Sequence, residues 1–246
     1  MQQFQPRGFS YLPVVVKNLL IINGIFFLGT LVFEKAFDID LVDYLGMHYF
    51  GSPLFKPYQI ITYMFMHGSI GHIFLNMFAL WMFGNVLENF WGPKRFLTYY
   101  MITGIGAILV QMIVAYMQIK NVEVFLSQTQ ISDIVSNGYN FLKEGKNFVD
   151  PASAKLNLLY NTPTIGASGA VFGLLLAFGM MFPNSIIYVY FAIPLKAKYF
   201  VIIYGLIELF SGIHTSSNDN VAHFAHLGGM LFGFILIRLW KIKRVN

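Results

Sequence analysis

Two polar side chains in otherwise apolar stretches have the chemistry needed for acyl transfer. Ser168 lies in TIGASGAVFG, at the start of an apolar run that continues to Phe182, and His226 lies in AHFAHLGGMLFG. Histidine is the usual general base at neutral pH, and a serine hydroxyl needs such a base to become a useful nucleophile. The two residues are therefore a candidate nucleophile and base, provided that the fold brings them together.

A third stretch, HGSIGHIFLN at 67–76, supplies hydrogen-bond donors for the same reaction. His72 and Asn76 are four residues apart, so they share one face of a helix. The oxyanion of a tetrahedral intermediate needs donors of this kind. Either residue alone is more simply explained by hydrogen bonds between helices. Together with Ser168 and His226, the pair favours an oxyanion hole.

Small residues predict that the segments carrying the serine and the histidine touch. GAVFG at 169–173 and GMLFG at 229–233 are both GxxxG patterns, which let helix backbones approach closely. Packing alone explains these glycines. It does not explain a serine immediately before the first pattern and a histidine one turn before the second, because ionisable residues within a span are functional candidates.

The composition predicts a polytopic membrane protein. The chain has 246 residues, of which 57% are hydrophobic and 11% are charged, and its mean hydropathy is +0.62. A soluble domain averages about 25% charged residues. Cysteine is absent, which excludes disulfides, thiolate catalysis and cysteine metal sites.

Six apolar segments define the expected fold, an all-α bundle of six transmembrane helices in one domain over 1–246. Each can cross a hydrocarbon core of about 30 Å. The first apolar segment, Val14–Phe33, has no small-residue cleavage site before Glu34, so we expect a retained span and not a cleaved signal. The predicted spans are Val14–Phe33, one within Ile60–Phe90, one within Phe96–Ile119, Pro163–Phe182, Tyr199–Ile213 and Val221–Trp240.

The start of the fourth span decides the depth of Ser168. Pro163 suits a first helical position, with Thr162 or Asn161 as its cap. Ser168 would then lie about 8 Å along the helix. His226 would lie a similar distance into the sixth span.

The charge distribution predicts the orientation. The net charge is +5, and ten of the 16 basic residues fall on one side of the six-span arrangement, whereas nine of the 11 acidic residues fall on the other. Short loops rich in Lys and Arg stay cytoplasmic. We therefore expect cytoplasmic termini and external loops at 34–58, 120–162 and 213–220. The ten basic residues are Arg7, Lys17, Lys94, Arg95, Lys196, Lys198, Arg238, Lys241, Lys243 and Arg244.

The long polar insertion at 120–162 has two possible interpretations. It is either a set of short amphipathic helices on the membrane surface or a loosely ordered loop. The apolar residues that suggest helices are Phe125, Ile131, Ile134, Val135, Phe141 and Leu142.

These motifs, in this order, resemble the rhomboids, serine proteases that cut inside the membrane, and among them the bacterial six-span type. The resemblance covers Val14–Trp240 without the insertion. HIFLN at 72–76, GASG at 166–169 and AHLGGMLFG at 225–233 carry it. Glu88, in NVLENFWG, also resembles a structural position of the family.

The resemblance implies a Ser-His dyad without an aspartate, in which Ser168 is the nucleophile and His226 the base. The backbone N–H of Ser168 and the side chains of His72 and Asn76 would form the oxyanion hole. No metal or cofactor is implied, and nucleic acid is not an expected partner. The residues expected to support the cavity, including the hydrated part that delivers water, are Gly166, Gly169, Phe172, His67 and His223.

The implied substrates are transmembrane protein segments in a lipid bilayer, which must unwind locally because a helix protects its own peptide bonds. The implied location is a bacterial inner membrane, with the active site opening to the external side. Two positions depart from the family pattern. Tyr58-Gln59 replaces a frequent Trp-Arg in the first external loop, and Phe172 replaces a frequent tyrosine that stacks on the catalytic histidine.

Two other functions compete with proteolysis. One is a metal transporter, since imidazole suits zinc and copper; against it, the sequence has no HExxH and the cytoplasmic halves of the spans are nearly free of polar residues. The other is a helix-binding chaperone or scaffold, against which the complete dyad argues. The histidines of the metal alternative are His67, His72, His223 and His226.

Glu208 is an acid in the fifth span, close in the chain to Phe210, which we assign to a lateral gate. It has two candidate roles: a hydrogen bond to a neighbouring helix, or a part in the substrate entrance.

Overall fold

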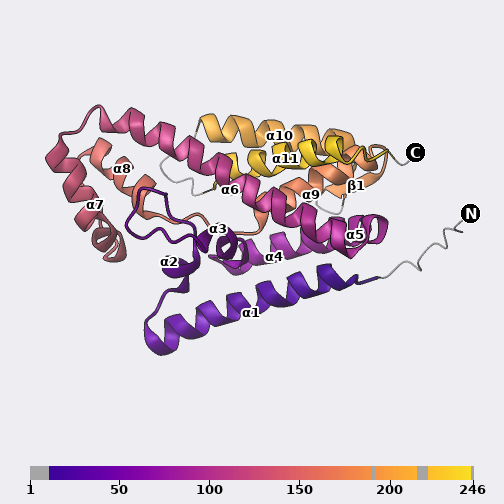
Figure 1. Ribbon diagram of the computed structural model, residues 1–246, viewed down its shortest axis with the longest axis horizontal. Helices are drawn as coiled ribbons and strands as arrows, with labels where there is room; N and C mark the ends of the chain where they lie inside the picture. Colours follow the sequence, from indigo (N-terminus) through magenta and orange to yellow (C-terminus); the bar gives the residue numbers. More distant parts are fainter. Residues whose placement is uncertain (1–10, 190–191, 215–220, 245–246) are drawn as a thin grey trace, which may run out of the picture.

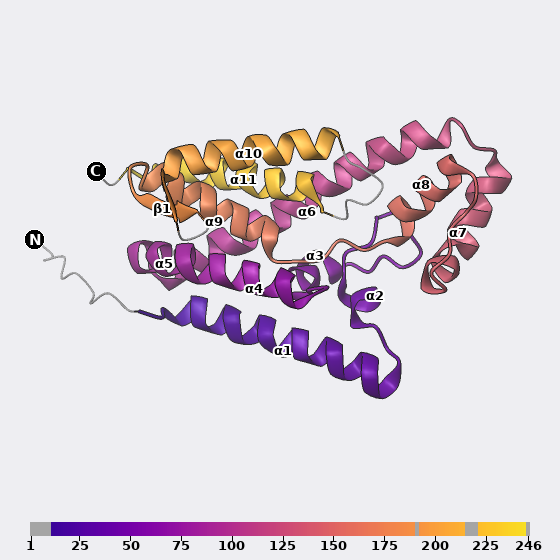
Figure 2. The same ribbon diagram turned by 180° about the vertical axis from the view of Figure 1, so that it is seen from behind.

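Six helical segments follow one another in the order of the predicted spans. The computed structural model describes residues 11–189, 192–214 and 221–244, so Arg7 and most of the expected loop 213–220 lie outside the described residues. Figures 1 and 2 show the segments side by side along one long axis. They are α1 (Val14–Phe37), α4 and α5 (Ile70–Ala79 and Asn85–Trp91, joined by the π-helical turn η2, Leu80–Gly84), α6 (Pro93–Glu123), α9 (Ser168–Met181), α10 (Ala197–Ile213) and α11 (His223–Leu239).

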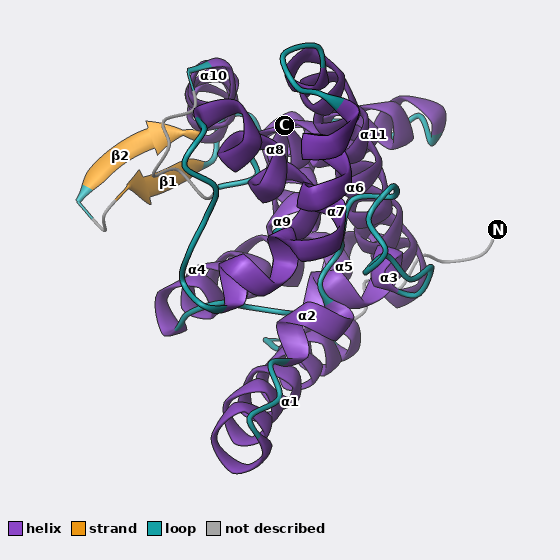
Figure 3. Cartoon of the chain, turned by 90° about the vertical axis from the view of Figure 1, so that its left-hand side faces the viewer, coloured by secondary structure: helices purple, strands orange, loops and turns teal. Residues whose placement is uncertain are grey.

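The lengths of these helices fit a membrane protein. Val14–Phe37, Ile70–Trp91 and Pro93–Glu123 are long and apolar enough to cross a membrane, and α9 and α11 are shorter apolar helices. Large aliphatic side chains on the outside of the bundle are exposed, among them Ile25 and Leu206. The predicted all-α bundle is confirmed, with one small addition. An antiparallel hairpin of β1 (Ile186–Val189) and β2 (Ile193–Lys196) projects beside α10 (Figure 3).

Close backbone contacts hold α11 against α6 and α9. The hydroxyl of Tyr99, on α6, donates a 2.9 Å hydrogen bond to the carbonyl of Gly173 on α9. Gly228, on α11, lies so near α6 that an added β-carbon would stand 3.0 Å from the Cα of Ala107. The small residues of the three helices therefore meet at one place, as expected for packing by small side chains in a membrane.

Glu88 joins the second span to the first. Its carboxylate is buried on α5 and accepts hydrogen bonds from the backbone N–H groups of Val15 (2.9 Å) and Val16 (2.8 Å). These groups belong to the first turn of α1, where N–H groups have no partner within the helix and an anion is favoured. The acid therefore acts as a cap supplied by another helix.

The fourth span begins later than the sequence predicts. Pro163 is not helical, and α9 starts at Ser168. The segment before it is extended because Thr164 exchanges two backbone hydrogen bonds with Met47, at 2.8 and 2.9 Å, and Gly166 donates a third to the carbonyl of Tyr63. Ser168 is therefore the first residue of its helix, and the expected depth of about 8 Å along it is wrong.

The first loop is built around Gln59, which begins α3 (Gln59–Thr62). The side chain is fully buried; its amide group donates to the carbonyls of Tyr44 and Leu54, both at 3.1 Å, and its oxygen accepts from the N–H groups of His48 and Lys56. The glutamine at this departure from the family pattern therefore ties together the loop that also contains α2 (Leu41–Leu45) and leads into η1 (Tyr63–Phe65).

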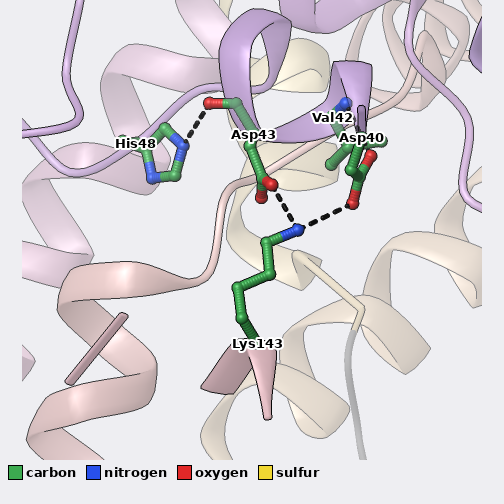
Figure 4. A network of polar contacts seen from close by, with 5 residues as sticks. All are labelled: Asp40, Val42, Asp43, His48 and Lys143. Carbon is green, nitrogen blue, oxygen red and sulfur yellow. Dashed lines mark hydrogen bonds and ion pairs between the residues drawn. The ribbon is translucent and has the colours of Figure 1, made fainter. Parts of the chain in front are cut away.

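The insertion is helical, which favours the first of its two interpretations. After α6 it forms α7 (Gln128–Lys143), with a capping box at Ser127, and α8 (Pro151–Asn161). Figure 1 shows both helices beyond one end of the bundle. Lys143 forms ion pairs with Asp40 and Asp43 of the first loop (Figure 4). Although burial disfavours its charge, these two carboxylates together raise the pKa of Lys143 to about 12.

Candidate active site

Ser168 and His226 lie in direct contact. The Oγ of Ser168 is 2.8 Å from Nε2 of His226, although the residues are 58 positions apart and belong to α9 and α11. Ser168 opens its helix, so the backbone N–H groups around it have no partner within α9. A candidate nucleophile, a candidate base and backbone donors that are unpaired within α9 are therefore combined at one helix end, an arrangement that could support acyl transfer.

The imidazole of His226 is held on three sides. Nε2 faces Ser168, and Nδ1 is 2.8 Å from Oε2 of Glu208 on α10. The ring of Phe172 stacks on one face, with ring centroids 4.1 Å apart and planes at 4°. Phe172 in turn contacts Tyr204 of α10. The phenylalanine that replaces the family's frequent tyrosine thus lies on the histidine.

Glu208 connects both histidines of α11. Its Oε2 is also 2.7 Å from Nδ1 of His223, and the acid and both imidazoles are buried. Of the two roles expected for Glu208, the structure shows the hydrogen bond to a neighbouring helix. Its contact with the candidate base is new. The available signal was the i,i+3 spacing of His223 and His226, which puts both on one helix face opposite an acid of the adjacent span.

Of the expected oxyanion donors, His72 is the one that the structure places near Ser168. Gly166 has φ of 120°, which favours glycine, and a β-carbon added there would stand 2.8 Å from Nε2 of His72 and 3.6 Å from Oγ of Ser168. His72 therefore borders the space next to the serine. Asn76 donates one amide hydrogen to the carbonyl of His72, at 2.9 Å, and retains a second hydrogen.

His67 packs against His72. The two rings meet edge to face with centroids 4.9 Å apart, and His67 is buried with neither ring nitrogen hydrogen-bonded within the described residues. The structure does not join these two histidines to His223 and His226 in one ligand set. Within the described part of the chain, the group with metal-binding geometry is Glu208, His223 and His226, whose ligand atoms lie within 4.8 Å of one another.

Comparison with known proteins gives the family. The family model described as "Rhomboid domain" matches residues 55–241. The chain belongs to the rhomboid family. Rhomboids are intramembrane proteases that act on membrane proteins in the bilayer, and the matched region contains Ser168, His226, His72 and Asn76.

Two relatives of this rhomboid carry related names. "RHOMBOID-like protein 12, mitochondrial" of Arabidopsis thaliana is 28% identical over 92% of this chain and 60% of its own length. "Rhomboid protein 1, mitochondrial" of Saccharomyces cerevisiae is 25% identical over 72% of this chain and 40% of its own length. This rhomboid thus aligns with only part of either relative. Both names are mitochondrial, so they do not support the expected bacterial inner membrane.

Proposed function

We propose that this rhomboid is an active intramembrane serine endopeptidase, with Ser168 as nucleophile and His226 as general base. The observation that carries the proposal is the 2.8 Å contact between Oγ of Ser168 and Nε2 of His226 across two helices. A packing serine has no need of a histidine nitrogen at hydrogen-bond distance, whereas a nucleophile requires one.

The chemistry follows from this contact. Nε2 of His226 accepts the hydroxyl proton as Ser168 attacks the carbonyl carbon of a peptide bond. The backbone N–H of Ser168 and the side chains of His72 and Asn76 stabilise the negative oxygen. His226 then protonates the leaving amine as the C–N bond breaks, which leaves an acyl group on Oγ of Ser168. In the second half, Nε2 of His226 takes a proton from a water molecule that attacks the acyl carbon, and it returns this proton to Oγ of Ser168 as the ester bond breaks.

The proposed substrates are transmembrane segments that unwind near the cleaved bond, because an intact helix does not expose its carbonyl groups to a nucleophile. The charge distribution supports an active site that opens to the side opposite the Lys- and Arg-rich loops.

The test is cleavage of a transmembrane substrate in liposomes by the wild type, Ser168→Ala and Ser185→Ala, with and without chelator. Ser185 is an exposed serine in the turn that follows α9 and is the matched control. We expect cleavage by the wild type and Ser185→Ala, none by Ser168→Ala and no effect of chelator. Equal cleavage by Ser168→Ala would overturn the proposal, and no cleavage of any substrate by the wild type would favour the helix-binding scaffold.

A further inference from the structure

We propose that Glu208 is a positioning residue for catalysis, which orients His226 and stabilises the imidazolium that forms on it. The site would then work as a serine, a histidine and a carboxylate supplied by three different helices, α9, α11 and α10. This inference rests on the proposed function and deepens it.

The first argument concerns the tautomer of His226. A carboxylate only accepts hydrogen bonds, and a single oxygen, Oε2 of Glu208, lies 2.7 Å from Nδ1 of His223 and 2.8 Å from Nδ1 of His226. Each Nδ1 must therefore carry its hydrogen. A neutral imidazole has one such hydrogen, so Nε2 of His226 is left with a free lone pair. That lone pair points at the hydroxyl of Ser168, which is the arrangement a general base needs.

The second argument concerns charge. Among the described residues, Glu88 and Glu208 are the two buried acids, with 3% and 6% of their surface exposed. Burying a carboxylate is costly unless hydrogen bonds compensate it. Glu88 is compensated by backbone groups of a helix N-terminus, a structural arrangement. Glu208 is compensated by His223 and by the candidate base itself, so its negative charge stands beside the positive charge that His226 would acquire during the reaction.

The third argument concerns how Glu208 is itself fixed. His223 lies one turn before His226 on α11 and donates to the same oxygen, which holds the carboxylate in register with the helix. The four buried residues of α10 include Glu208 and Gly212, and an added β-carbon on Gly212 would meet Cβ of His223 at 3.2 Å. The docking of α10 onto α11 therefore sets the position of Glu208, and through it that of the His226 ring.

The experiment compares two glutamate-to-glutamine changes in the same assay. Glu208→Gln and Glu88→Gln each neutralise a buried carboxylate that accepts two hydrogen bonds, and both keep the side-chain shape. For each we would measure kcat, KM, the rate at which a fluorophosphonate labels Ser168, and the free energy of unfolding. Glu208→Asp, which keeps the charge on a shorter side chain, is the conservative variant.

We expect Glu208→Gln to lower kcat by roughly 10²- to 10⁴-fold, the upper figure being about the loss that soluble serine proteases show without their orienting carboxylate, with KM nearly unchanged. Serine labelling should fall in parallel, and Glu208→Asp should recover at least a tenth of the lost kcat. Glu88→Gln should lower stability and leave kcat per folded molecule unchanged, because its carboxylate touches α1 and not His226.

Three results would overturn the inference. If Glu208→Gln keeps wild-type kcat and labelling while Ser168→Ala is inactive, the proposed protease stands and Glu208 is only structural. If both glutamine variants lose stability equally and kcat per folded molecule falls in neither, the same conclusion holds. If chelator abolishes wild-type cleavage and zinc restores it, Glu208, His223 and His226 bind a metal instead.

Discussion

Gly229 lies directly against the backbone of Gly169. A β-carbon added to Gly229 would stand 1.8 Å from the carbonyl oxygen of Gly169 and 2.7 Å from its carbonyl carbon. The contact is between main chains, so no side-chain rotation can relieve it. It lies one residue after Ser168 on α9 and three residues after His226 on α11, and the separation of the two helices at this point therefore sets the distance between Ser168 and His226.

Gly229→Ala should accordingly disrupt both stability and chemistry. Overpacking of this kind costs about 1–3 kcal/mol, and the better helix propensity of alanine offsets at most about 1 kcal/mol of it. A displacement of about 1 Å in a reacting geometry can cost on the order of 10²-fold in rate. We expect a lower free energy of unfolding in detergent and a cleavage rate reduced at least tenfold.

Gly24→Ala is the control for Gly229→Ala. Gly24 lies in the middle of α1, and an added β-carbon there meets no atom within 4 Å. This variant should be as stable as the wild type or slightly more stable, with the same cleavage rate. Wild-type behaviour of Gly229→Ala would mean that α9 and α11 are farther apart than the structure has them.

The sequence was sufficient where the signal is local. Composition predicted a membrane protein, apolar runs predicted the order of the helices, and the GxxxG patterns predicted that α9 and α11 touch. The apolar runs and the GxxxG patterns depend on residues close together in the chain, and composition needs no contact between distant residues at all. The family match at 55–241 agrees with the resemblance carried by the three motifs.

The sequence was insufficient where a distant partner decides the structure. Pro163 has the local features of a first helical residue, yet Met47, more than a hundred positions earlier, holds the adjacent Thr164 in an extended pairing and delays the helix to Ser168. Glu208 likewise has no sequence motif. Its contact with His226 depends on the rotation of α10 about its axis relative to α11, and the positions of the apolar spans in the sequence do not determine that rotation.

Phe172 gives the second prediction, because its ring lies flat on the imidazole of His226. Phe172→Leu keeps the site apolar and removes the stacked plane that restrains the histidine. Aromatic contacts of this kind contribute about 0.5–1.5 kcal/mol, so kcat should fall roughly 2- to 10-fold with little change in KM. Kinetics on a transmembrane substrate would measure both values.

Two control variants test whether the effect of Phe172→Leu comes from the ring on His226. Phe172→Tyr keeps the ring and restores the frequent family residue, so it should retain wild-type kcat. Phe178 is on the same helix, and its ring packs on Phe83 and Phe182 and not on His226. Phe178→Leu should therefore lower stability without lowering kcat. A similar loss of kcat in both leucine variants would attribute the effect to general packing of α9.

The last prediction concerns pH and the first loop. His48 is fully buried, and its Nε2–H donates a 2.9 Å hydrogen bond to the carbonyl of Asp43 (Figure 4), whereas Nδ1 is buried without a hydrogen-bond partner in the described residues. Burial therefore lowers the pKa of His48 below its ordinary value of 6.5. In the unfolded chain His48 titrates near 6.5, so below that pH the unfolded chain binds a proton at His48 more readily than the folded chain does. Stability linked to His48 is complete above that value and is lost as the pH falls toward the lowered pKa of the folded state.

His48→Gln tests this linkage, since the amide can still donate to Asp43 and does not titrate. Between about pH 6.5 and 5 the wild type should lose stability more steeply than the variant, by at most about 1.4 kcal/mol per pH unit, the limit for one proton. Above about pH 7.5 the two unfolding free energies should run parallel, because His48 is then neutral in both states; this is the internal control. Denaturant unfolding in detergent across this range measures the difference, and identical slopes below pH 6.5 would show that the first loop opens to admit the proton without unfolding.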